Sequence, residues 1–130
     1  MEDLKPVYIV SLGPGEAGLI SLIGGATLCR ANAIFCPKTN ARSRSSVLLK
    51  ELKIKKESIR RYTLPMSKKR EMAYEAYDKV FEEIVSLYSE GLCVAIVAEG
   101  DAGFYSSTSY LVGKLKKVGI PIKQIAGVPA

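Results

Sequence analysis

Leu92–Ala98, with the sequence LCVAIVA, is an unbroken apolar run in the second half of the chain. Such a run is typical of a central strand in a parallel sheet, where helices cover both faces. Residues 68–90 precede it and carry an apolar stripe at helical spacing, and Gly91 follows them as a C-cap. The stripe consists of Ala73, Tyr77, Val80, Phe81, Ile84 and Tyr88. A long helix followed by a buried strand indicates an α/β fold.

The remaining elements continue this alternation in both directions. Short runs rich in β-forming residues predict strands at 6–12, 33–36, 58–64 and 121–126, the second of them stopped by Pro37. Helical spacing predicts helices at 19–30, 47–52 and 107–118. The pattern predicts an open five-stranded parallel sheet with right-handed crossovers and helices on both faces, a three-layer αβα architecture. Ligands in such sheets bind beyond the carboxyl ends of the strands.

Composition restricts the class of protein. The chain has 130 residues, of which 48% are hydrophobic and 25% are charged, and this suits one domain with its own core. The net charge of +6 favours an anionic partner without identifying it. The sequence contains no histidine, which excludes histidine ligands, bases and triads. No metal site is expected.

The cysteines and the apolar runs bear on location. Cys29, Cys36 and Cys93 are far apart and stand in apolar runs, so we expect small buried side chains in a reducing compartment. The first residues do not resemble a signal peptide, and no apolar run approaches the roughly 18 residues that cross a membrane. We therefore expect a cytoplasmic protein with no membrane partner.

Gly13–Gly18, GPGEAG, follows the first predicted strand and matches the GxGxxG pattern. One interpretation is a dinucleotide site, but that site needs an acidic residue about 20 residues on, and Cys36, Pro37 and Lys38 stand there. Pro14 also removes an N–H from the loop that would hold the pyrophosphate. A second interpretation is a tight turn without a ligand.

Residues 99–106, EGDAGFYS, follow the strongest predicted strand and are predicted to form a loop through Tyr105. Gly100 at a strand end would allow close approach of a ligand, and the Asp101 carboxylate could accept hydrogen bonds from an ammonium or hydroxyl group. Gly-Asp is also an ordinary turn dipeptide.

Taken in order, four stretches resemble the tetrapyrrole methylase family, and most of all its precorrin-2 (or cobalt-factor II) C-20 methyltransferases. They are VYIVSLGPGEAGLISL at 7–22, FCPK at 35–38 with LPMSK at 64–68, AIVAEGDAGFYSSTSYL at 95–111, and GIPIKQIAGVPA at 119–130. Two positions depart from the family pattern, since Ala102 and Ala126 stand where the family has proline. Pro37 stands where sister enzymes have an aspartate base, and the C-20 subgroup lacks that base as well.

This resemblance implies an S-adenosylmethionine-dependent methyltransferase acting in cobalamin (vitamin B12) biosynthesis, homodimeric, with the cofactor in a cleft between two domains. The chain would be the N-terminal domain of such an enzyme, with the C-terminal domain absent, and inactive by itself. Pro14, Gly100, Asp101 and Phe104 would line the cofactor site, and the catalytic residue is unknown. Tyr105 would face cofactor or substrate, or belong to the core.

The substrate implied by the resemblance carries many carboxylates. Lys38, Arg42 and Arg44 lie in the basic segment after the second predicted strand, and we hypothesise that they attract these groups. A solvated loop is the simpler interpretation of the same charges. Methylation of another tetrapyrrole or of rRNA and a non-catalytic nucleotide-binding domain remain alternatives. The basic segment lacks the interleaved aromatic residues that favour single-stranded nucleic acid, so we expect no nucleic-acid partner.

Overall fold

The structure, a computed structural model, describes residues 5–11, 22–38, 49–50, 52–63, 70–98 and 102–125. Five parallel strands form one sheet in the order β3-β2-β4-β1-β5. The strands are β1 (Val7–Ser11), β2 (Ala33–Lys38), β3 (Ile59–Thr63), β4 (Val94–Ala98) and β5 (Ile122–Ile125). The helices are α1 (Leu22–Arg30), α3 (Arg70–Ser89) and α4 (Ala102–Lys117), with a 3-10 turn η1 (Lys56–Ser58). Residues 49 and 50 are also helical.

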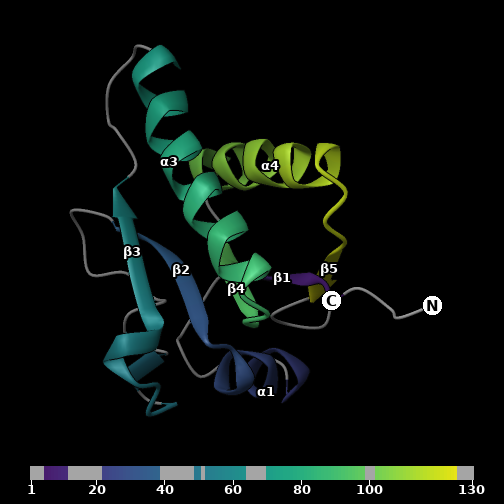
Figure 1. Ribbon diagram of the computed structural model, residues 1–130. Coiled ribbons are helices and arrows are strands. Elements are labelled where there is room, and N and C mark those ends of the chain that lie inside the picture. Colours follow the sequence, from purple (N-terminus) through teal and green to yellow (C-terminus); the bar gives the residue numbers. More distant parts are fainter. Residues whose placement is uncertain are drawn as a thin grey trace.

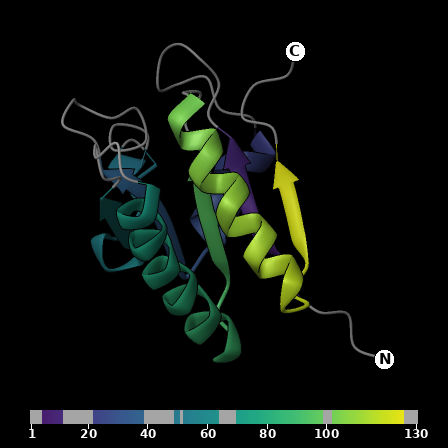
Figure 2. The ribbon, with the colours of Figure 1, turned by 90° about the horizontal axis from the view of Figure 1, so that it is seen from above.

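Helices cover both faces of this sheet, with α3 and α4 on one face and α1 on the other (Figures 1 and 2). On the first face, Leu111 and Leu115 of α4 and Ile84 of α3 are fully buried against apolar strand residues. On the second face, Leu28 of α1 and Leu49 pack against the opposite side chains of the same strands. The predicted three-layer αβα fold is therefore confirmed.

The central strand is the one that the apolar run predicts. All five residues of β4 are buried, and the strand lies between β2 and β1. The stripe predicted for the long helix faces the core from Tyr77 onward, because Val80 and Ile84 are buried and Tyr77, Phe81 and Tyr88 pack against the core. The side chain of Ala73 lies outside the description. Gly91 ends this segment with φ +83°, a left-handed conformation that favours glycine.

Three expectations were wrong. β2 continues through Pro37 to Lys38, in register with Thr63 of β3. The pairing of β2 with β4 ends at Phe35, and a proline is tolerated where a strand has no ladder partner on one side. Residues 102–105 are helical, because α4 begins at Ala102. Cys29 is exposed, whereas Cys36 is buried and Cys93 is partly buried.

Candidate functional site

The ends of β1 and β4 bring the two glycine-containing segments together. Ser11 and Ala98 are the last residues of these strands and are partners in the parallel register. The segments that contain Gly13–Gly18 and Gly100–Asp101 therefore begin from neighbouring points at one edge of the sheet. Two stretches that lie far apart in the sequence can thus contribute to one site.

The connections that follow β1 and β4 leave toward opposite faces of the sheet. After β1, the chain leads to α1, whose Leu28 packs with Val10. After β4, it leads to α4 on the other face of the sheet (Figure 1). There, Leu111 of α4 packs with Ile9. In open α/β sheets, ligands bind beyond the carboxyl ends of neighbouring strands whose connections diverge in this way. The fold thus indicates a ligand position beyond Ser11 and Ala98.

The predicted cofactor-binding residues differ in how far the structure describes them. Pro14, Gly100 and Asp101 lie outside the described residues, so their predicted roles stay predictions. The backbone of Phe104 and Tyr105 lies in the first turn of α4, next to the carboxyl end of β4, and their side chains are outside the description.

The predicted substrate-binding residues follow β2. Lys38 is the last residue of this strand, which neighbours β4, and its side chain is not described. Arg42 and Arg44 lie outside the described residues. The backbone therefore brings the start of the basic segment to the same edge of the sheet as the two glycine-containing segments.

A polar cluster fixes α4 against α3. The Asp78 carboxylate accepts hydrogen bonds from the Tyr110 hydroxyl at 2.8 Å and from the Lys114 ammonium at 2.5 Å. The hydrogen bond from Lys114 holds the pKa of Asp78 below its ordinary value, and the same bond raises the pKa of Lys114. The Lys114 ammonium also lies 4.7 Å from the centre of the Phe81 ring. These contacts hold the second half of α4 against α3.

Sequence reasoning missed a group of residues further along α4. Thr108, Ser109 and Lys116 line a hollow together with Gln124 of β5. Positions 108, 109, 112, 113 and 116 share one side of a helix, and this spacing is the signal that could have selected them. The partner strand could not be found in the same way, since it depends on the order of strands in the sheet.

Comparison with known proteins agrees with this geometry. The sequence model of a family described as Tetrapyrrole (Corrin/Porphyrin) Methylases matches residues 6–130. A probable cobalt-precorrin-2 C(20)-methyltransferase of Methanocaldococcus jannaschii is 28% identical over 127 residues, which cover 96% of this chain and 54% of that protein. This chain therefore spans about half the length of that relative.

Two solved structures share the fold. A cobalt precorrin-4 methyltransferase superposes with a TM-score of 0.68 and 21% identity, covering 95% of this chain and 46% of that one. A uroporphyrin-III-C-methyltransferase from Thermus thermophilus superposes with a TM-score of 0.64 and 18% identity over the same shares of the two chains. With the family match over nearly its whole length, the chain belongs to the tetrapyrrole (corrin/porphyrin) methylase family.

Proposed function

We propose that the protein containing this chain, called the full-length protein below, methylates C-20 of precorrin-2 or cobalt-factor II in cobalamin biosynthesis. The similarity to the C(20)-methyltransferase of Methanocaldococcus jannaschii, which covers 96% of this chain, carries this proposal. Membership of a methylase family supports methyl transfer in general. Because the chain spans about half of that relative, the activity is proposed for the full-length protein, as a cytoplasmic homodimer.

The described backbone offers a position for S-adenosylmethionine, the proposed methyl donor. The paired ends Ser11 and Ala98, with connections that diverge to opposite faces, supply the edge position at which α/β sheets bind ligands. When bound, this cofactor supplies an electrophilic methyl group on a sulfonium. We propose that Pro14 and Gly100 approach it with their backbone.

Asp101 and Phe104 would orient this cofactor. Asp101 would accept a hydrogen bond from it, and Phe104 would exclude water as an apolar wall. Tyr105 would face cofactor or substrate. A dry site that fixes both reactants is what an in-line methyl transfer requires from the protein.

Asp101 can be tested apart from its structural role. It directly precedes α4, and an aspartate at that position can also cap the helix. Asparagine caps helices about as well, so Asp101→Asn should leave thermal stability nearly unchanged while it raises the apparent KM for S-adenosylmethionine. An unchanged KM would show that the carboxylate does not contact the cofactor.

The substrate carboxylates provide a second test. We propose that Lys38 and Arg42 attract them from the segment after β2. Arg42→Ala should then raise the substrate KM with little change in the S-adenosylmethionine KM. Lys117→Ala is the matched control, because Lys117 is an exposed lysine at the carboxyl end of α4, the end away from the proposed site. Equal substrate KM values for the two variants would contradict the proposed role of Arg42.

The reaction itself is tested by product analysis. The full-length protein is incubated with S-adenosylmethionine carrying a 13C methyl group and with precorrin-2 or cobalt-factor II, and carbon NMR locates the label. The proposal expects the label at C-20. A label at another carbon would assign a different tetrapyrrole methylation. In a parallel incubation with rRNA in place of the tetrapyrrole, transfer to rRNA with none to either tetrapyrrole would assign the RNA alternative.

A further inference from the structure

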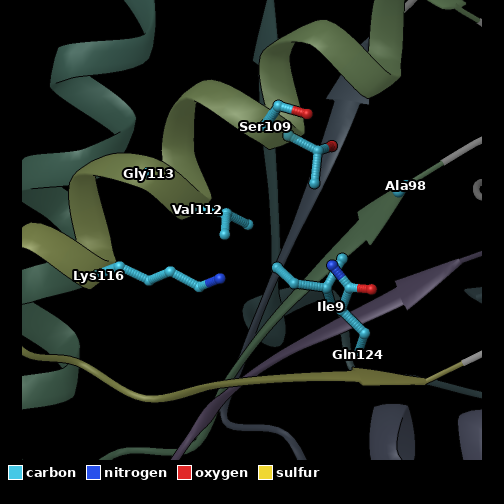
Figure 3. A pocket seen from close by; sticks show the side chains of 8 residues that line it. Ile9, Ala98, Ser109, Val112, Gly113, Lys116 and Gln124 are labelled. Atoms are coloured by element: carbon cyan, nitrogen blue, oxygen red, sulfur yellow. The ribbon is translucent and has the colours of Figure 1, made fainter.

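A hollow of about 440 Å³ lies between α4 and the sheet (Figure 3). The strands contribute Ile9 of β1, Ala98 of β4 and Gln124 of β5, and Ile9 and Gln124 lie side by side as register partners. One side of α4 contributes Thr108, Ser109, Val112, Gly113 and Lys116. Because Gly113 has no side chain and a Cβ there would meet nothing within 4 Å, the helix does not fill the space in front of it.

The lining combines an apolar floor with hydrogen-bond donors. Ile9 and Ala98 form the floor but are each only 2% exposed, so the apolar side chain that a ligand can cover is that of partly exposed Val112. Thr108 and Ser109 bring hydroxyl groups, and Gln124 brings an amide. Among the lining residues that the structure describes, none is acidic. A ligand with both an apolar part and a hydrogen-bond acceptor suits such a lining.

Lys116 gives the hollow its charge. Its side chain extends from α4 toward Ile9 and Gln124 (Figure 3). Lys114, two residues earlier, is matched by Asp78. Within the part of the chain that the structure describes, no carboxylate forms an ion pair with Lys116. The hollow therefore holds a positive charge that a ligand can neutralise.

We propose that this hollow binds a small organic anion with one carboxylate and a short apolar tail. The tail would pack against Val112, and the carboxylate would accept hydrogen bonds from Lys116 and Gln124. A single ammonium balances one carboxylate, whereas a doubly charged phosphate would leave excess charge. The hollow shares Ala98 with the strand edge at which the cofactor site is proposed, so the two sites are neighbours, and binding of the anion does not itself require methyl transfer.

Hexanoate is a suitable probe, with hexanol as its uncharged counterpart and hexyl phosphate as the alternative anion. Each is titrated into the 15N-labelled full-length protein while amide shifts are followed by NMR. We expect saturable shifts at Ser109, Gly113 and Gln124 with hexanoate, and none with hexanol. Saturation by hexanol, tighter binding of hexyl phosphate, or no shift with hexanoate would overturn the proposal.

Variants separate this site from general surface charge. Lys116→Gln should weaken hexanoate binding by up to about fivefold, the size expected for the loss of one exposed ion pair. Lys117→Gln is the control, because Lys117 is exposed on the same turn and does not line the hollow. Gly113→Leu should abolish binding by filling the space, and a leucine inside a helix favours folding. Equal affinities for the two lysine variants, or full binding by Gly113→Leu, would refute the site.

Discussion

Replacing Leu111 by alanine tests whether packing on the sheet holds α4 in place. Leu111 of α4 is fully buried against α3 and the strands. The substitution removes three carbon groups, which corresponds to about 2.4 kcal/mol of lost transfer free energy. The neighbours belong to a sheet and a second helix, so they can close little of the cavity. We therefore expect the free energy of unfolding to fall by about 3–5 kcal/mol.

Urea unfolding followed by circular dichroism measures this loss. The midpoint should fall while the slope of free energy against urea stays the same, because the surface exposed on unfolding hardly changes. Val118→Ala is the matched control, since Val118 is 57% exposed just after the same helix. That variant should change the free energy of unfolding by less than about 0.5 kcal/mol.

The comparison of the two variants shows whether α4 depends on the packing of Leu111. A loss below about 1 kcal/mol for Leu111→Ala, with an unchanged slope, would show that α4 does not depend on this packing. An equal loss for both variants would lead to the same conclusion. In either case, the first turn of α4 would need another anchor in order to present Phe104 and Tyr105.

The remaining predictions concern an ion pair, a thiol and a turn. The pKa of Asp78 is lowered in the folded protein, so its stabilising effect relative to Asp78→Asn should persist at neutral pH and shrink as the pH falls below 3.8 in acid unfolding curves. The pKa of Lys114 is raised, so its own contribution should be lost only as the pH rises beyond 10.5. Maleimide should label exposed Cys29 in the folded chain and buried Cys36 only after unfolding, as peptide mass spectrometry can check. Gly119 has φ +84°, so Gly119→Ala should cost about 1–2 kcal/mol in a thermal melt.

The fold could be predicted because its central elements carry strong local patterns. The apolar run at β4 has all five strand residues buried, and the stripe on α3 repeats at helical spacing. The start of α4 could not be predicted in this way, because Gly103 and the serines near it are weak helix formers. Packing of Leu111 and Leu115 on the sheet overrides that local preference.

The candidate site could be predicted from the sequence only in part, for a related reason. Glycine-containing segments mark strand ends locally, and β1 and β4 do end as neighbours. Consecutive residues of a helix point about 100° apart, so Cys29 is exposed although adjacent Leu28 is fully buried. The hollow beside α4 depends on how far that helix lies from β5, and this is a tertiary distance that no local pattern contains.

The start of α4 also changes the meaning of Ala102, which stands where the family resemblance expects proline. Ala102 is the first helical residue. Proline is favoured at this position because its φ suits the helix, and because the N–H that proline lacks would have no hydrogen-bond partner within the helix. Alanine adopts the same helical conformation here, so a proline at this position would act mainly by restricting the unfolded chain. Ala102→Pro should therefore raise the free energy of unfolding by about 0.4–1 kcal/mol and leave the S-adenosylmethionine KM within about twofold. A loss of stability in urea unfolding would place this residue outside the helix, and a strongly changed KM would show that the turn moves with the cofactor site.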